Sequence, residues 1–394
     1  MKSKPHLPSL AEMLGQLVAT PSVSSVNPSL DQSNRALVDL LAAWFSELGF
    51  TVEILPVSPH PEKVNLIARW QGSSGSGGLV LSGHTDTVPY DTSGWSYNPF
   101  KLTEREGRWY GLGTTDMKCF FALVLDALRD IDGASVRRGL TVLATADEES
   151  SMNGARKLID LGVGLGEHAL IGEPTGLIPV YKHKGVMMEA IRVQGRSGHA
   201  SDPALGNSAL EGMHRVMSEL LGWREELGTR FRDRSFAVAV PTVNFGAIRG
   251  GDNPNRICAN CELQLDLRLL PGMEPAAIRG ELQEIVSRGI AASGLKADFS
   301  SLFEPVPPFE GRPSSEIVAL TARLSGNAPG TVAFATEAPF LCALGMETVV
   351  CGPGDIDQAH QADEYVSKDR VLAMRAIVCG LVEHFCLSDP RRAD

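Results

Sequence analysis

The sequence predicts an α/β protein with a mostly parallel sheet flanked by helices, into which a smaller domain is inserted. Strand-like apolar runs alternate with amphipathic segments up to residue 181 and again from residue 303, which is typical of a parallel sheet with helices on both faces. Between 182 and 302 the order becomes βαββαβ, the ferredoxin-like split motif, and its strands alternate apolar with polar residues. We therefore expect a larger domain in two segments, 1–181 and 303–394, around an inserted domain at 182–302.

Each element is assigned from its hydrophobic period. In the first segment we expect helices over 9–20, about 30–48, 120–131 and 153–162, and strands over 51–57, 65–70, 78–84, 140–146 and 168–174. In the inserted domain we expect strands over 185–195, 241–251, 256–270 and 295–301, and helices over 209–227 and 274–292. A helix over 314–326, a strand over 346–354 and a helix over 369–386 complete the larger domain.

Composition excludes several classes of function. The chain has 394 residues and a net charge of −11, whereas nucleic acids and membrane surfaces attract basic proteins. Its 7 cysteines are an odd number scattered along the chain, which indicates reduced thiols. The Cys258-x-x-Cys261 pair resembles half of a zinc knuckle, but no second pair follows, and the surrounding residues alternate like a strand. Without a secretory or membrane-spanning segment, the cytoplasm is the expected location.

Acidic and histidine-bearing segments follow several of the apolar runs. They are LVLSGHTDTVP (79–89), YGLGTTDMK (110–118), LTVLATADEESS (140–151), LIGEPT (170–175) and DQAHQADEYV (357–366). Such strand ends converge at one edge of an α/β sheet, where ligands bind. Nitrogen and oxygen donors in that arrangement suit a metal site.

Each of these residues also has an ordinary interpretation. His84 and Asp86 could occupy a strand-terminal turn, Asp116 could cap a helix, and the adjacent Glu148 and Glu149 could be solvated. Adjacent glutamates point to opposite sides of the chain, so one could bind a metal while the other holds a water. Taken together, the segments supply two histidines, three acids and a spare glutamate, about what two zinc ions need.

The blocks SGHTDTVP, GTTDMK, TADEE, GEPT and SGHAS resemble the dinuclear-zinc superfamily of aminoacylases, glutamate carboxypeptidases and acyl-amino-acid deacetylases. The resemblance runs over nearly the whole chain. It implies two Zn²⁺ per subunit, with Co²⁺ as a possible substitute. By this resemblance, one zinc would be held by His84 and Glu173 and the other by Glu149 and His360, and Asp116 would bridge the two ions. Asp86 would orient His84, and Glu148 would act as the general base.

Within the superfamily, ATEAPF (335–340) and CGPGDIDQAHQADEYV (351–366) are most similar to the acetylornithine deacetylase family. This implies hydrolysis of N2-acetyl-L-ornithine to L-ornithine and acetate, a step of arginine biosynthesis. Glu337 could pair with the substrate's δ-ammonium, or it could be a solvated acid. The alternatives are a succinyl-diaminopimelate desuccinylase, an aminoacylase, a dipeptidase or a carboxypeptidase, and a non-catalytic zinc-binding protein.

The inserted domain adds further candidates by the same resemblance. Arg256 and Asn244 are placed like the family's binders of the substrate α-carboxylate, and an arginine suits that group because it can bind both oxygens. His199, in GRSGHAS, resembles the histidine that stabilises the oxyanion, commonly across a homodimer formed through the inserted domain. Arg268 is expected in a structural ion pair. The expected partner is thus a small acylated amino acid.

Overall fold

The computed structural model describes residues 7–57, 60–73, 78–162, 164–291 and 293–388. Two predictions fall partly outside the described residues. The expected lack of a secretory signal concerns a segment that begins with residues 1–6, and one expected helix ends at residue 292. The chain divides into two compact units. Unit 1 comprises Met1–Tyr181, Gly311–Gly330 and Thr336–Asp394, and unit 2 comprises Lys182–Glu310 and Thr331–Ala335.

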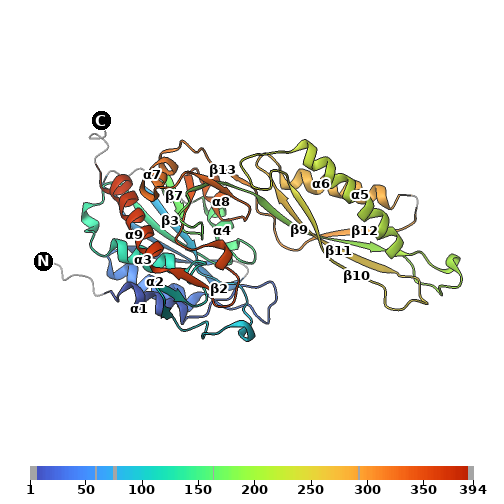
Figure 1. Cartoon of the computed structure of the whole chain (residues 1–394), viewed down its shortest axis with the longest axis horizontal. Coiled ribbons are helices and arrows are strands. Elements are labelled where there is room, and N and C mark those ends of the chain that lie inside the picture. The colour runs from blue at the N-terminus through green and yellow to red at the C-terminus, as the bar shows by residue number, and fades with distance from the viewer. Residues whose placement is uncertain (1–6, 58–59, 74–77, 163, 292, 389–394) are drawn as a thin grey trace. The chain divides into compact units, whose positions relative to one another are not determined.

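Unit 1 is built on a sheet that is parallel at its centre and antiparallel at its sides, which confirms the predicted fold class (Figure 1). Its strand order is β1 (Thr51–Val57), β2 (His60–Trp70), β6 (Leu140–Thr145), β3 (Leu79–His84), β7 (His168–Ile171), β15 (Glu347–Val350) and β8 (Val180–His183). β6, β3, β7 and β15 run parallel, whereas β1, β2 and β8 run antiparallel to their neighbours. The carboxyl ends of β6, β3 and β7 therefore lie at the same edge.

Helices and a small second sheet complete unit 1. The helices are α1 (Leu10–Val18), α2 (Arg35–Glu47), α3 (Lys118–Leu128), α4 (Asn153–Leu161), α7 (Glu316–Ser325), α8 (Ala338–Ala343) and α9 (Lys368–Val382). The small sheet has the order β16 (Tyr365–Ser367), β5 (Arg108–Tyr110) and β4 (Thr103–Arg105). Along the described residues, no helix combines the length and apolar character that a membrane crossing needs.

Helix α2 begins at Arg35, later than the expected start near residue 30. The preceding Asn34 is buried, and its side chain does not cap the helix. Instead its amide nitrogen donates to the carbonyl oxygen of Val64 at 2.8 Å and to the hydroxyl of Thr85 at 2.7 Å, while its amide oxygen accepts from the Val64 N–H at 2.9 Å. This tertiary contact fixes where the helix can begin.

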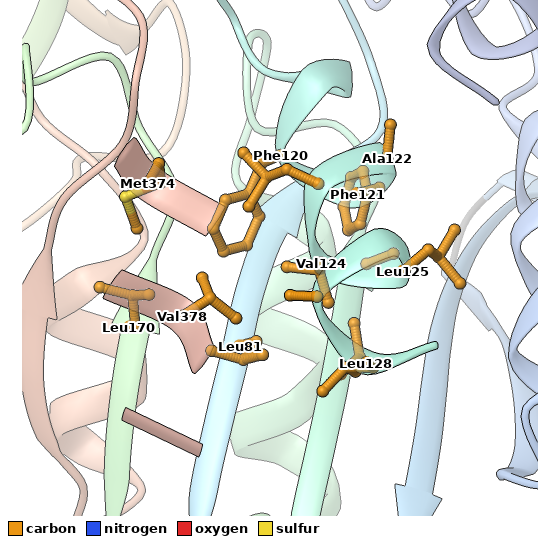
Figure 2. Close-up of a cluster of buried hydrophobic side chains, with 14 of the residues drawn as sticks. Leu81, Phe120, Phe121, Ala122, Val124, Leu125, Leu128, Leu170, Met374 and Val378 are labelled. Atoms are coloured by element: carbon orange, nitrogen blue, oxygen red, sulfur yellow. The ribbon is translucent and has the colours of Figure 1, made fainter. Parts of the chain in front are cut away.

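Helix α3 packs directly against the central strands and α9 (Figure 2). It also contacts α1. Two glycines allow the close approach. A Cβ atom on Gly83 would lie 2.5 Å from the Met117 side chain, and one on Gly172 would lie 2.2 Å from the Phe120 ring. Because these glycines immediately precede His84 and Glu173, the packing brings the start of α3 close to both residues.

Unit 2 has the element order expected of a βαββαβ domain. The elements are β9 (Gly185–Gln194), α5 (Ala209–Arg230), β10 (Thr242–Gly250), β11 (Asn260–Leu269), α6 (Pro275–Gly289) and β12 (Lys296–Ser301). The sheet order is β10-β11-β9-β12, and every pair is antiparallel. The unit extends past the expected boundary at 302 to Glu310, because β13 (Phe309–Glu310) pairs with Lys182 and His183 at the end of β8. β14 (Gly330–Val332) also pairs with β8.

We expect Leu81→Ala to lower the free energy of unfolding by about 2–5 kcal/mol, because it opens a cavity beneath α3. Leu81 is fully buried, whereas Leu372 on α9 is 56% exposed. Leu372→Ala is therefore the matched control and should change the free energy by less than about 0.5 kcal/mol. Urea denaturation of the two variants measures the difference, and equal effects would contradict the packing described.

Candidate metal centre

The first group of converging side chains lies at the ends of β3 and β7 and the start of α3. It consists of His84, Asp116 and Glu173, all buried, and their ligand atoms lie within 4.8 Å of one another. Nε2 of His84 is 3.0 Å from Oδ1 of Asp116 and 3.9 Å from Oε2 of Glu173. His84 is the last residue of β3, and Glu173 follows β7 by two residues. The strand ends thus bring these residues together as the sequence indicated.

The second group shares Asp116 with the first and adds Glu149 and His360. Nε2 of His360 lies 3.1 Å from Oε1 of Glu149 and 3.4 Å from Oδ2 of Asp116. Glu149 follows β6, and His360 comes from the loop after β15. Asp116 therefore presents one oxygen to each histidine, which is the position a bridging carboxylate would occupy.

The tautomer of His84 fits metal binding through Nε2. Its Nδ1 lies 3.0 Å from the main-chain oxygen of Asp86, and because a carbonyl oxygen only accepts, Nδ1 carries the proton in the neutral ring. The Nε2 lone pair then points toward Asp116 and Glu173. Oε1 of Glu173 is buried without a hydrogen-bond partner among the described residues. These features fit a site that holds divalent cations.

Burial and mutual repulsion dominate the electrostatics of the two groups. Burial, reinforced by Asp116, raises the pKa of both Glu173 and Glu149. Burial would also raise the pKa of Asp116, but hydrogen bonds with His360 and His84 hold it below its usual range. Conversely, hydrogen bonds to Asp116 and Glu149 raise the pKa of His360 to about 10. In the metal-free fold, protons on the imidazoles therefore balance part of the carboxylate charge.

Glu148 lies beside these groups, with a carboxylate oxygen within 4.8 Å of ligand atoms of His84 and Glu149. Burial and the nearby charge of Glu173 raise its pKa well above the ordinary value. Asp86 holds the turn that carries both glutamates. Its two carboxylate oxygens accept the main-chain N–H groups of Glu148 at 3.2 Å and Glu149 at 3.1 Å.

Asp86 was expected to orient the His84 ring, and its main-chain carbonyl lies closer to that ring than its side-chain carboxylate does. The carboxylate of Asp86 lies 3.6 Å from Nδ1 of His84, longer than the 3.0 Å to the Asp86 carbonyl. The Asp86 carboxylate instead accepts hydrogen bonds from the main-chain N–H groups of Glu148 and Glu149. This anchoring role could not be predicted from the sequence, because it depends on how the turn after β6 folds.

Two further buried groups were also missed. Nζ of Lys63 lies 2.7 Å from a carboxylate oxygen of Asp31 and 2.7 Å from one of Asp147, the residue immediately before Glu148. Glu364 accepts three main-chain N–H groups from the loop that ends at Asp116. Glu364 stands in the polar segment that contains His360, but nothing in that segment indicated a partner near residue 116.

Glu337 is buried in unit 1, not solvated. Its Oε2 accepts a hydrogen bond from the hydroxyl of Thr145 at 2.9 Å, and its Oε1 has no partner among the described residues. Burial raises its pKa to about 7, against the effect of the Thr145 hydrogen bond. The charge of Glu337 in turn raises the pKa of Glu173. An acid with one buried unpaired oxygen is suited to bind a cationic group.

The residues of unit 2 that were predicted to bind substrate or stabilise the oxyanion lie in two separate places, one at the loop of Arg256 and the other on β10. A β-bridge joins the main chains of His199 and Arg256, and Arg256 is paired with Asp252 in its own loop. That loop lines a cavity of about 620 Å³ within the unit. Asn244 is near the start of β10, opposite Asp266, whereas Arg256 follows the end of that strand. Arg268 forms the expected ion pair, with Asp266 at 2.9 Å.

The chain is similar in sequence to proteins named acetylornithine deacetylase. The chain is 46% identical over 383 residues to an acetylornithine deacetylase from Klebsiella pneumoniae, covering 97% of this chain and 99% of the relative. It is also 46% identical to an acetylornithine deacetylase from Proteus mirabilis, covering 97% and 98% of the two chains.

Solved structures share the fold at low sequence identity. An M20 family metallo-carboxypeptidase from Sulfolobus solfataricus superposes with a TM-score of 0.76 at 17% identity, covering 96% of this chain and 99% of that chain. A dinuclear metal-binding M20 peptidase from Bacillus subtilis superposes with a TM-score of 0.66 at 14% identity, covering 95% and 97%. The profile of the peptidase family M20/M25/M40 matches residues 80–384. With the fold, the converging ligands and the relatives in agreement, the chain belongs to the peptidase family M20/M25/M40.

Proposed function

We propose that this protein is a metal-dependent amide hydrolase that removes the acetyl group from N2-acetyl-L-ornithine, giving L-ornithine and acetate. The observation that carries the proposal is the pair of three-residue groups that share Asp116. It is supported by relatives named acetylornithine deacetylase along nearly the whole chain. The reaction would place the protein in arginine biosynthesis.

Two zinc ions are the proposed cofactors, with cobalt as a substitute that accepts the same ligands. His84 and Glu173 would hold one ion, Glu149 and His360 the other, and Asp116 would bridge them. The donor set supports this assignment, because each group contains one imidazole and two carboxylates. Divalent ions, when bound, polarise the amide carbonyl and lower the pKa of a water molecule.

Glu148 is the proposed general base and acid. It would take a proton from the attacking water as the water oxygen bonds to the acetyl carbon. It would then deliver that proton to the α-nitrogen as the carbon–nitrogen bond breaks. The proton left on the new carboxyl group would pass to the released amine, so that acetate and the ammonium form of ornithine leave. The position of Glu148 beside both groups supports this role, because its carboxylate is not needed to complete either of them.

His199 is the proposed donor to the oxyanion that develops on the carbonyl oxygen. Its Nδ1 accepts a hydrogen bond from the Ser201 N–H at 3.2 Å and lies 2.7 Å from the Ser201 hydroxyl. Because Nδ1 accepts, the proton of the neutral ring sits on Nε2. Nε2 would then donate to the developing charge.

We propose that three residues recognise the substrate: Glu337 of unit 1, and Arg256 and Asn244 of unit 2. Arg256 and Asn244 would bind the α-carboxylate. The Arg256–Asp252 pair is exposed, and such surface pairs are weak enough to exchange for a substrate carboxylate. Glu337, whose Oε1 has no hydrogen-bond partner within the described ranges, would bind the δ-ammonium. We also propose that unit 2 forms the interface of a homodimer, as in the family that the sequence resembles.

Glu148→Gln should lower kcat by about 10²–10⁴-fold, because an amide cannot take the proton from water. The zinc content should stay unchanged, since Glu148 is not among the proposed ligands. Glu167→Gln, an exposed glutamate at the opposite end of the sheet, is the control and should be fully active. Hydrolysis of acetylornithine and elemental analysis measure the two properties. Normal turnover of Glu148→Gln with full zinc would reject the assignment.

Zinc binding should release protons and tighten as the pH rises. The pKa of His360 is raised to about 10 in the metal-free protein, so below that pH the imidazole must lose its proton before it can bind zinc. For each proton released, affinity should increase about tenfold per pH unit. Calorimetric zinc titrations at pH 8, in buffers with different ionisation enthalpies, give the number of protons released.

The same titration with His360→Asn should release fewer protons than the wild type. His384→Asn is the matched control, because His384 pairs with Glu316 instead of the acids of the two groups. It should release as many protons as the wild type. If His360→Asn also matched the wild type, His360 would not be the residue that zinc deprotonates.

Glu337→Gln should lower kcat/KM for acetylornithine by roughly 10–100-fold, the worth of one charge-assisted hydrogen bond. It should change kcat/KM for acetylmethionine by less than about threefold, because that substrate has no ammonium for Glu337 to bind. The comparison is made on one enzyme preparation with both substrates. An equal loss on both would mean that Glu337 supports the fold of the site and does not recognise the side chain.

A further inference from the structure

Glu364 joins the loop that carries Asp116 to the segment that carries His360. Its side chain is buried, with 2% of its surface exposed. Oε1 accepts the N–H groups of Thr115 at 2.7 Å and Asp116 at 3.1 Å, and Oε2 accepts the N–H of Gly113 at 2.9 Å. Three N–H groups from four consecutive residues therefore converge on a single carboxylate.

The carboxylate is not required merely to hold the two segments together. Tyr365 pairs with Tyr110 in the small sheet. The Gly111 N–H also donates to the main-chain oxygen of Glu364 at 3.0 Å, and the Thr115 hydroxyl donates to that of Tyr365 at 2.6 Å. These contacts would remain without the carboxylate. What the carboxylate adds is a fixed orientation of the peptide groups that lead into Asp116.

The residue whose main chain is held in this way belongs to both ligand groups. Oδ1 of Asp116 faces His84 and Oδ2 faces His360, so a small rotation of its backbone would misplace an oxygen in each group. Glu364 also follows His360 by four residues in the chain. The Glu364 side chain thus fixes the position of Asp116, which both groups share, relative to His360 of the second group.

We propose that Glu364 is a positioning residue for both metal ions. It does not bind them, but it fixes the direction of the Asp116 carboxylate by accepting hydrogen bonds from the main-chain N–H groups of Gly113, Thr115 and Asp116. The inference rests on the proposed metal pair. It adds a residue whose contribution should appear in metal affinity and coordination geometry, apart from any effect on hydrolysis.

The test is Glu364→Gln, which keeps the size of the side chain. Its amide group would replace one carboxylate oxygen and present N–H groups to backbone N–H groups that need an acceptor. We expect zinc affinity, measured by competition with a chromophoric chelator, to weaken about 10–100-fold. The visible spectrum of the cobalt-substituted protein should also change, because it reports the coordination geometry. Thermal unfolding of the metal-free protein is recorded in parallel.

Asp363→Asn is the matched control from the adjacent position. Oδ1 of Asp363 accepts the N–H groups of Ser96 at 2.8 Å and Tyr97 at 3.3 Å, so the variant disturbs backbone hydrogen bonds to a different loop. It should keep the wild-type zinc affinity to within about threefold. If Glu364→Gln binds zinc as tightly as the wild type, or if both variants weaken binding equally, the positioning role is wrong.

Two further outcomes separate this inference from the proposed function. A wild type that binds zinc but does not hydrolyse acetylornithine would reject the proposed substrate, and the affinity difference between the variants would still decide the role of Glu364. A wild type that binds no zinc would overturn both proposals. If Glu364→Gln does not fold, Glu364→Asp keeps the carboxyl group but shortens the reach, and it should weaken zinc binding more than Asp363→Asn.

Discussion

The candidate metal centre of unit 1 gathers four acids, Asp116, Glu148, Glu149 and Glu173, with two imidazoles at one edge of the sheet. Burial makes each carboxylate unfavourable in its charged form, and their mutual repulsion adds to that penalty. Side chains of this kind remain together where positive charge balances them or where some of the acids are protonated. In the metal-free protein, protons on His84 and His360 supply part of that positive charge, and divalent cations would supply more.

Most positions of the proposed metal ligands could be predicted from sequence because strand periodicity determines them. His84 ends an apolar strand, and Glu149 and Glu173 follow two others, so a parallel arrangement is sufficient to bring them to one edge. The two glycines at 83 and 172 then let α3 approach closely, which places Asp116 at the same edge. His360 follows no such rule, because it lies in an irregular loop with a positive φ of 59°. It was identified from its residue type and from the resemblance.

The supporting residues could not be predicted, because their partners are distant in sequence and belong to the main chain. Glu364 and Asp86 each accept N–H groups that become available only when a loop takes its folded path. Lys63 lies in a strand whose pattern indicated no partner, yet its ammonium anchors Asp147 before the two glutamates. The later start of α2 has a similar origin, since the Asn34 side chain is used to join β2 to Thr85.

Selectivity within a fold shared by peptidases and deacetylases requires a group that distinguishes substrates of similar size. Glu337 suits this purpose because one of its oxygens accepts a hydrogen bond from Thr145, and the other is buried and has no partner in the part of the chain that the structure describes. A substrate that brings an ammonium group satisfies that oxygen, whereas a neutral side chain leaves it unpaired at a cost of about 1–3 kcal/mol. Discrimination would then come as much from the penalty on neutral substrates as from attraction to the cationic one. The same acid raises the pKa of Glu173, so the charge proposed to select the substrate would also act on the proposed metal ligands.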